Sequence, residues 1–490
     1  MTYARTLAGG LAAISAAVGS TVAVVAPAPA AAAAVPVVAA AAKRSWTRTS
    51  DFNGDGFADL AVGAPGATVA GHAGAGYVAV IPGSRRGLEP AKKKIFSQAT
   101  RGVPGSPAEY RWFGESLATA DLNGDTYADL IVGTPRDTDT PDGIARPGSL
   151  TIFFGSKSGL GRPQRILGKA GLGSAVTAAD MNGDGRPEVV ATETPSNFGR
   201  VVRFTVAKKS FKAVRTATEP VYGLGGIAGG DVNGDGYDDV VTLFRQVGGS
   251  QSFALFTGSK AGLSAEPASV HVHEGGADLA LGDLNRDGRA DLVVGRPVAR
   301  FGIEATGEVY LFWGTQEGFA EEADRVINQD SAGVPETAEE YDQFGSAVAI
   351  GDLTGDGNPE LVIGAQRETL GTIEAAGAVT VMRGSVSGPS AGKAQFFARG
   401  AGGLGGKKQL NEQFGWLATI RDFNGDRKSD LAVTAIGGNA SAEWPYYGDG
   451  SVTVLNGSAK GAVGKGAKVI TPKSVGTSAT DAKFGWSLGR

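Results

Sequence analysis

The side chains best suited to chemistry in this sequence lie in a short acidic motif that recurs seven times. The motif reads Asp-x-Asn/Thr-x-Asp-x-x-x-Asp/Glu, so oxygen-bearing side chains occupy its positions 1, 3, 5 and 9. Calcium is a hard cation that takes six to eight oxygen ligands, and three carboxylates neutralise its charge. Zinc prefers nitrogen and sulfur ligands, and magnesium keeps more of its water. The motif therefore predicts up to seven Ca²⁺ sites.

Each copy of the motif is expected to bind one ion through four side chains, and the backbone carbonyl at position 7 adds a fifth oxygen. Glycine at position 4 or 6 permits the tight wrap of the chain, because glycine adopts positive φ freely. The predicted side-chain ligands are Asp51, Asn53, Asp55, Asp59, Asp121, Asn123, Asp125, Asp129, Asp180, Asn182, Asp184, Glu188, Asp231, Asn233, Asp235, Asp239, Asp283, Asn285, Asp287, Asp291, Asp352, Thr354, Asp356, Glu360, Asp422, Asn424, Asp426 and Asp430.

Two alternatives compete with this interpretation of the motif. A helical calcium loop, as in an EF-hand, requires a carboxylate at position 12. Position 12 is apolar in six of the seven copies and falls within a predicted strand, so the helical alternative is excluded. The other alternative is a set of metal-free turns, because Asp, Asn and Gly favour turns by themselves. The recurrence of four oxygen positions in seven copies favours calcium.

Every acidic motif stands in the same frame of short predicted strands. A β-branched run follows the motif directly, as at Leu60–Pro65 and Leu130–Pro135. A segment of the form Gly-x-Val-x-Val-x-x-Gly-Ser comes later, as at Gly76–Ser84 and Gly450–Ser458, and a Phe-Gly pair often precedes the motif by eight residues, as at Phe113. This order, with a less regular fourth segment, gives about four strands per repeat. Four-stranded units repeated in series are typical of β-propeller blades.

Seven copies at intervals of 51 to 70 residues indicate one repetitive architecture rather than three ordinary domains. We predict an all-β fold, a seven-bladed β-propeller of four-stranded blades over residues 46–490. The first motif lacks a preceding Phe-Gly pair, but Phe484–Leu488 at the C-terminus matches Phe414–Ala418. We therefore expect residues 484–490 to supply the first strand of the blade that contains Asp51, so that the two ends of the chain close the ring.

Phe-Gly, the acidic loop and Gly-Ala-Pro recur in a fixed order that resembles the FG-GAP repeat of the integrin α-subunit propeller. The resemblance covers residues 51–490 and implies a calcium ion in the loop between the first two strands of a blade. It also implies that partners bind on the face opposite the calcium loops. The central blades depart from the pattern, since Ala191–Pro195 and Val241–Phe244 replace Gly-Ala-Pro, and Gly223-Leu224 and Gly275-Gly276 replace Phe-Gly.

Composition excludes several other functions. A net charge of −4 argues against nucleic-acid binding, which needs a basic face. The absence of cysteine excludes disulfides and thiol nucleophiles, and only three histidines are present. His271 and His273 share one side of a predicted strand, where we expect them to be exposed strand residues rather than metal ligands. Phe153, Phe154, Phe312 and Trp313 are expected to pack between blades. We predict that the protein is not an enzyme by itself.

The first 45 residues have the composition of an export signal and a linker. Arg5 precedes a weakly apolar stretch at Leu7–Val25, and alanines near Ala30 offer A-x-A cleavage sites. We predict a signal peptide at 1–32 and an Ala/Pro-rich linker at 33–45. The alternative is an uncleaved membrane anchor, but glycine and serine make the stretch a poor span. A secreted, extracellular protein without a membrane span is expected.

These features favour a binding or adhesion module, expected to be a monomer, whose partner is an extracellular protein or glycan. The alternative is a calcium-stabilised extracellular hydrolase or an accessory, lectin-like carbohydrate-binding protein. A third hypothesis is a rigid spacer protein without a small-ligand site. Insertions between the second and third strands, at 136–147, 297–306, 366–376 and 436–448, lie on the face opposite the acidic loops. The predicted ligand contacts are Trp444, Tyr446 and Tyr447, with cover of the channel rim as their alternative role.

Overall fold

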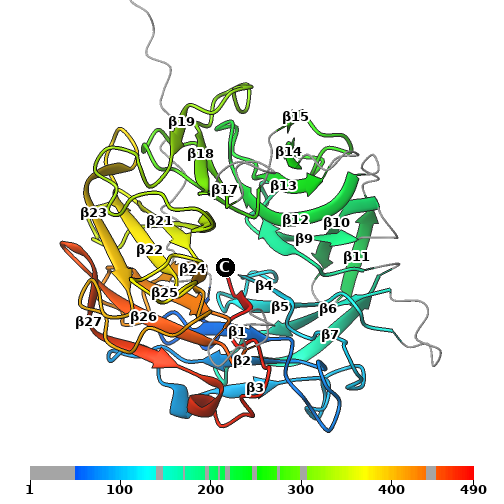
Figure 1. The fold of residues 1–490 in the computed structure, drawn as a ribbon. Helices are drawn as coiled ribbons and strands as arrows, with labels where there is room; N and C mark the ends of the chain where they lie inside the picture. The colour runs from blue at the N-terminus through cyan, green and yellow to red at the C-terminus, as the bar shows by residue number, and fades with distance from the viewer. Residues whose placement is uncertain are drawn as a thin grey trace, which may run out of the picture. The chain divides into compact units, whose positions relative to one another are not determined.

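The computed structural model describes residues 50–138, 147–168, 171–193, 198–207, 210–215, 221–245, 251–272, 276–297, 306–437 and 448–490. These residues form a seven-bladed β-propeller of four-stranded antiparallel blades (Figure 1). Within these ranges the only helices are two short 3₁₀ segments, η2 (Pro90–Lys92) and η3 (Pro472–Val475). In the described part of the chain, no helix has the length and apolar character needed to cross a membrane.

Blades one to four, each given from its first to its fourth strand, are β28 (Ser487–Leu488), β1 (Leu60–Ala64), β2 (Tyr77–Ile81) and β3 (Lys94–Phe96); β4 (Ser116–Ala120), β5 (Asp129–Thr134), β6 (Ser149–Phe154) and β7 (Gly161–Leu167); β8 (Val176–Ala179), β9 (Glu188–Glu193), β10 (Phe198–Ala207) and β11 (Ser210–Arg215); and β12 (Val221–Gly230), β13 (Asp239–Arg245), β14 (Gln251–Phe256) and β15 (Ser269–Val272). A short backbone pairing between β10 and β12 links the sheets of blades three and four.

Blades five to seven, in the same order, are β16 (Asp278–Gly282), β17 (Asp291–Arg296), β18 (Glu308–Phe312) and β19 (Arg325–Ile327); β20 (Phe344–Gly351), β21 (Glu360–Ala365), β22 (Ala378–Arg383) and β23 (Ser390–Ala398); and β24 (Phe414–Arg421), β25 (Asp430–Ala435), β26 (Ser451–Ser458) and β27 (Gly461–Ile470).

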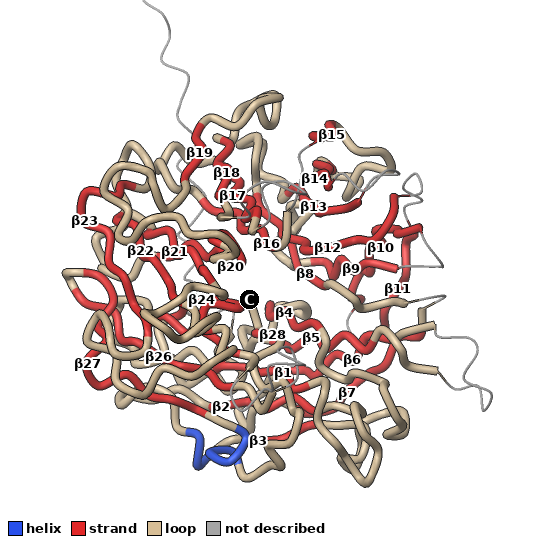
Figure 2. The backbone as a smooth tube through the Cα atoms, viewed as in Figure 1, coloured by secondary structure: helices blue, strands red, loops and turns tan. Residues whose placement is uncertain are grey.

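The first strand of each blade lies next to the centre of the ring and the fourth lies at its rim (Figure 2). Contacts run from β28 to β4, β8, β12, β16, β20 and β24, and then back to β28. Every second-strand residue whose burial is described is buried, because neighbouring blades cover both faces of each sheet. Phe153 and Phe312 are fully buried in these layers, which confirms their predicted packing role.

The C-terminus completes the first blade, as the sequence predicted. β28 pairs antiparallel with β1, with Leu488 opposite Val62 and Ser487 opposite Gly63. The Gly485 N–H donates to the Gly63 carbonyl at 2.9 Å, and Phe484 is fully buried. Figure 1 shows the C-terminus at the centre of the ring.

Where a blade has a Phe-Gly pair, this pair joins it to the blade before it. Phe414 lies beside Gly377, and Phe484 lies beside Gly450; each glycine immediately precedes the third strand of the preceding blade. Both glycines have positive φ, and a Cβ atom there would lie 2.1 and 2.3 Å from the Phe414 and Phe484 carbonyl oxygens. The first glycine of the Gly-x-Val-x-Val segment is therefore required by backbone packing between blades.

Candidate functional site

In blades two to seven the acidic loops connect the first and second strands, and in blade one the loop directly precedes the second strand, β1. The loops therefore share one face of the ring, here called the loop face. In the first loop, Asp51 Oδ1 accepts from the Gly54 N–H at 2.7 Å, and Asp51 Oδ2 accepts from the Gly56 N–H at 2.8 Å. The second loop repeats this arrangement around Asp121. The first aspartate therefore organises the backbone of the loop, in the manner of an Asx turn.

The carboxylate at position 9 ties the loop to the turn between the third and fourth strands. Asp59 Oδ2 accepts from the Phe52 N–H at 3.1 Å, and Asp59 Oδ1 accepts from the Gly83 N–H at 2.9 Å. A Cβ atom on Gly83 would lie 2.3 Å from the Ala58 carbonyl oxygen. The sequence showed the Gly-Ser pair that contains Gly83, but only the three-dimensional pairing reveals that this glycine holds the last carboxylate of the loop.

The predicted ligands come together to different degrees. Position 3 lies beside position 9 in the seventh loop, where Asn424 Nδ2 is 3.0 Å from Asp430 Oδ1. Position 3 also meets position 5, since Asn53 Oδ1 accepts from the Asp55 N–H at 2.8 Å. Among the described residues, no three acidic or histidine side chains already converge on one point.

The crowded loop carboxylates are electrostatically strained. The pKa of Asp59 is raised to about 7. Burial is the main cause, and repulsion from the neighbouring carboxylates of Asp51 and Asp55 also contributes. The same causes raise the pKa of Asp129 to about 7 and that of Asp239 to about 6. A cation within the loop would relieve this repulsion, because opposite charge favours the ionised form.

The donor set fits a hard cation in the first, second and fourth loops. Ionised carboxylates are acceptors only and have about four lone-pair sites, which leaves capacity beyond the backbone N–H groups. Within the described ranges, no basic side chain forms an ion pair with the carboxylates of these three loops. In the fifth loop Arg289 pairs with Asp287 alone, at 3.0 Å. The sixth loop differs, because Arg383 contacts two of its carboxylates.

A second cluster of side chains lies on the face opposite the acidic loops. It surrounds the starts of β28, β4 and β24, the first strands of blades one, two and seven. This axial cluster consists of Trp112, Glu115, Arg136, Trp416, Lys483 and Trp486, all of them half-buried. The rings of Trp416 and Trp486 are 5.0 Å apart, and Lys483 Nζ lies 4.7 Å from the Trp486 ring centre. The Arg136 guanidinium lies 3.3 Å from the ring centre of Trp112. Burial raises the pKa of Glu115 to about 7, although Lys483 and a hydrogen bond from Trp486 oppose this.

The predicted ligand contacts Trp444, Tyr446 and Tyr447 lie in 438–447, outside the described residues. The signal peptide and linker predicted over 1–45 also lie outside them, as does His273. His271 is described, and the expectation that it is exposed was wrong. It is 6% exposed, stacks on Phe253 at 4.4 Å, and has a pKa lowered by burial.

An acidic pair that sequence patterns did not reveal lies between blades five and six. Asp342 and Glu368 are buried, and Gln329 Nε2 donates to Glu368 Oε2 at 2.7 Å. Burial, reinforced by Asp342 and by Glu336 and Glu339, raises the pKa of Glu368 to about 8. No sequence motif marks this pair, because the three side chains come from two blades and meet only through the fold.

We expect the free energy of unfolding to fall as the pH rises from about 4.5 to about 8, in part through Glu368. Its folded pKa lies above the ordinary value of 4.5, so the folded protein holds this proton more tightly than the unfolded chain does. Glu368→Gln should flatten this slope in urea titrations at pH 5 and pH 9, with exposed Glu266→Gln as the control. Equal slopes in both variants would contradict the assignment.

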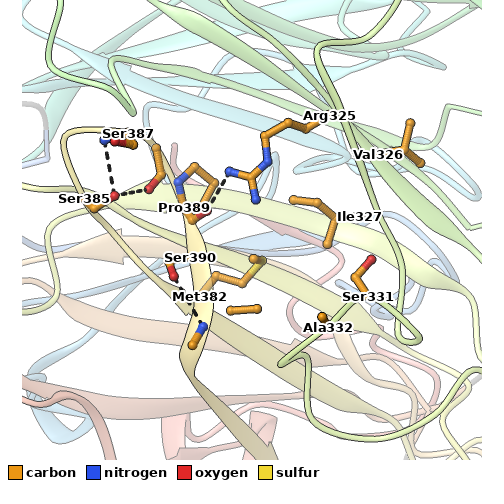
Figure 3. Close-up of a pocket in the computed structure, with 13 residues that line it drawn as sticks. Arg325, Val326, Ile327, Ser331, Ala332, Met382, Ser385, Ser387, Pro389 and Ser390 are labelled. Carbon is orange, nitrogen blue, oxygen red and sulfur yellow. Dashed lines mark hydrogen bonds between the residues drawn. The ribbon is translucent and has the colours of Figure 1, made fainter.

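A shallow groove of about 480 Å³ lies between blades five and six (Figure 3). Met382 and Ile327 contribute its apolar side chains, and Ser331 and Ser390 contribute hydroxyl groups. Arg325 Nη1 donates to the Pro389 carbonyl at 2.7 Å. No carboxylate or imidazole is among the residues that line this groove, so it offers no acid–base pair for catalysis.

Comparison with known proteins agrees with this geometry. The FG-GAP repeat model matches residues 45–81, 113–153 and 344–382, and an FG-GAP-like repeat model matches residues 216–294. The chain is 36% identical over 156 residues to phosphatidylinositol-glycan-specific phospholipase D of Homo sapiens, which covers 30% of this chain and 18% of that protein.

Integrin α chains match a longer stretch. Integrin alpha pat-2 of Caenorhabditis briggsae is 26% identical over 317 residues, covering 60% of this chain and 22% of that protein. Integrin alpha-8 of Gallus gallus is 30% identical over 216 residues, covering 40% of this chain and 20% of that protein. The chain thus spans about a fifth of the length of these curated relatives. The repeats, the blades and these matches together identify the chain as an FG-GAP repeat protein that resembles the integrin α propeller.

Proposed function

We propose that this chain is a secreted, calcium-stabilised FG-GAP propeller that acts as a binding or adhesion module for an extracellular protein or glycan. The loop face supplies the calcium sites, which stabilise the blades. The opposite face supplies the surface that meets the partner. The resemblance to integrin α chains supports an extracellular partner, and the export signal predicted from the sequence supports secretion.

The axial cluster is the observation that carries this proposal. Tryptophan, tyrosine and arginine are enriched at binding hot spots, and the axial cluster contains three tryptophans and Arg136. The loop 366–376 belongs to the same face, because it connects β21 and β22. Trp444, Tyr446 and Tyr447 remain ligand contacts predicted from the sequence alone. Loops held by a rigid scaffold are where binding residues usually lie.

Calcium would be held by the carboxylates at positions 1, 5 and 9 and by the oxygen at position 3. When bound, it supplies positive charge that offsets three carboxylates in each loop. Hydrogen bonds within the chain fix the conformation of the loop before calcium binds. In the first blade, the backbone N–H groups of Gly54 and Gly56 donate to Asp51, and that of Gly83 donates to Asp59.

The hydrolase alternative rests on the phospholipase D relatives, of which this chain spans about a fifth. We infer that the chain works by binding, because 21 of its 50 acidic residues belong to the acidic loops and the groove between blades five and six offers no acid–base pair. A robust hydrolase activity abolished by one substitution away from the acidic loops would overturn this inference. Assays of the purified chain on phospholipid and glycoside substrates provide the measurement.

The partner class can be tested with calcium-loaded protein on a glycan array and in a pull-down from an extracellular protein fraction. The triple variant Trp444→Ala, Tyr446→Ala and Tyr447→Ala should weaken binding to the captured partner by about 2 kcal/mol or more if these aromatics are hot spots. The melting temperature and calcium affinity of the variant should stay close to wild type, because binding anchors lie outside the blade core.

Val386→Ala provides a matched control, since Val386 is an exposed apolar residue at the β22–β23 turn on the loop face. It should leave partner binding unchanged. Unchanged binding by the triple variant, together with a large fall in melting temperature, would assign the three aromatics to the channel rim instead.

A further inference from the structure

The sixth acidic loop already contains a positive charge of its own. Arg383, at the end of β22, donates from Nη2 to Asp356 Oδ2 at 2.9 Å. Its Nε lies 3.5 Å from Glu360 Oε1. The guanidinium therefore bridges positions 5 and 9 of the loop, the two carboxylates that a calcium ion would have to share. Arg383 is also sheltered, with a side chain 25% exposed.

This arginine is specific to the sixth blade. Leu361 follows the loop and pairs with Met382, so that Arg383 is the next residue along β22. The strand registers of the other six blades place uncharged residues at the same position, namely Pro82, Phe154, Thr205, Thr257, Trp313 and Asn456. At this strand position, only the sixth blade carries a cationic side chain. In the third blade, Arg203 of β10 also acts electrostatically on Glu188, but it pairs with Val190 and therefore comes from a different position of the strand.

Neighbouring contacts also distinguish the sixth loop. Thr354 replaces the usual asparagine, and its hydroxyl lies 3.2 Å from Asp352 Oδ1 and 3.4 Å from Glu360 Oε1. A second guanidinium reaches the loop from blade five, because Arg286 Nη1 lies 3.4 Å from Asn358 Oδ1. Position 9 is also held less closely, since the Gly384 N–H lies 3.4 Å from Glu360 Oε1.

A guanidinium and a divalent cation compete for such a pair of carboxylates. Arginine presents five N–H donors in a planar fork and stays protonated at any ordinary pH. Calcium between Asp356 and Glu360 would lie next to this charge and be repelled by it. The carboxylates of the first, second and fourth loops have no basic partner within the described residues, so no such repulsion acts there.

We propose that the sixth loop is closed by the guanidinium of Arg383 in place of calcium, so that this chain binds at most six calcium ions. The inference rests on the proposed function, because it assumes that the loops without a basic partner do bind calcium. The sixth blade thereby keeps its loop folded at calcium concentrations that empty the others.

A reciprocal exchange with the seventh blade tests this proposal. Arg383→Asn gives the sixth blade the residue of the seventh, and Asn456→Arg does the reverse. Equilibrium dialysis followed by atomic emission should find one more calcium per chain in Arg383→Asn than in wild type, and one fewer in Asn456→Arg. Arg325→Asn, which removes an arginine outside any loop, should leave the count unchanged. An unchanged count in Arg383→Asn would overturn the proposal.

Melting in chelator separates this inference from the proposed function. Without calcium, Arg383→Asn should melt a few degrees below wild type, because Asp356 and Glu360 then lack any cation. Added calcium should restore the loss. A wild-type chain that binds no calcium would refute the proposed function, and a lower melting temperature of Arg383→Asn in chelator would still support closure by arginine. Equal melting temperatures in chelator would overturn that closure.

Discussion

Removal of residues 482–490 is expected to open the ring and convert the monomer that we predict into aggregates. The deletion takes away β28, the partner of β1, and leaves the inner edge of the first blade unpaired. Exposed strand edges invite pairing with other chains. It also removes Phe484, which is fully buried; loss of such a side chain costs about 3–5 kcal/mol. That is a large part of a typical total stability of about 5–15 kcal/mol.

The C-terminus also ties distant blades together, which adds to the expected loss. Arg490 donates through both terminal nitrogens to Asp278 in the fifth blade, at 2.7 and 3.0 Å. Light scattering after size exclusion, together with thermal melting, should show large particles and an early transition for the truncated chain. Phe484→Ala should reproduce much of the loss, whereas Val469→Ala, at an exposed position of β27, should not. A truncated chain that stays monomeric and melts as wild type does would refute closure.

The closure was predictable because it depends on a local signal that repeats. Phe484-Gly matches Phe414-Gly, and the first blade lacked the same pair, so the missing element could be assigned without coordinates. The blade count followed from the same repetition. In contrast, the contact between Arg383 and Glu360 depends on the register of β21 and β22, and no motif connects residues that lie that far apart in sequence.

His271 shows why local pattern failed on an outer strand. Side chains alternate between the two faces of a strand, so Val270 and Val272 share one face and His271 lies on the other. Hydrophobicity alone would place the valines toward the core and the histidine toward solvent. In β15 the valines are instead 47% and 58% exposed, and His271 faces the core against Phe253. The strand lies at the rim, where one neighbouring sheet covers it, and its register to β14 decides which side faces that sheet.

Removal of calcium is expected to cause the second large loss of stability. Each loop carries three carboxylates, and in six of the seven loops we propose that calcium supplies the balancing charge. A ligand that binds only the folded state contributes about 2.7 kcal/mol at a concentration one hundred times its dissociation constant. Neighbouring loops are in contact, since the Ala58 N–H donates to the Asp422 carbonyl at 3.2 Å and the Ala128 N–H donates to the Asp51 carbonyl at 3.0 Å. Contributions from adjacent loops are therefore coupled, whereas those from loops on opposite sides of the ring add.

Differential scanning calorimetry with excess calcium and with chelator measures this loss directly. The transition should move to lower temperature in chelator and return when calcium is restored. Magnesium should restore less, since it dehydrates reluctantly and demands stricter geometry. Asp55→Asn weakens one proposed site at an exposed position, so it should remove only a fraction of the calcium-dependent shift. An identical transition with and without chelator would instead show that backbone N–H groups alone hold the loops, as Asx turns without metal.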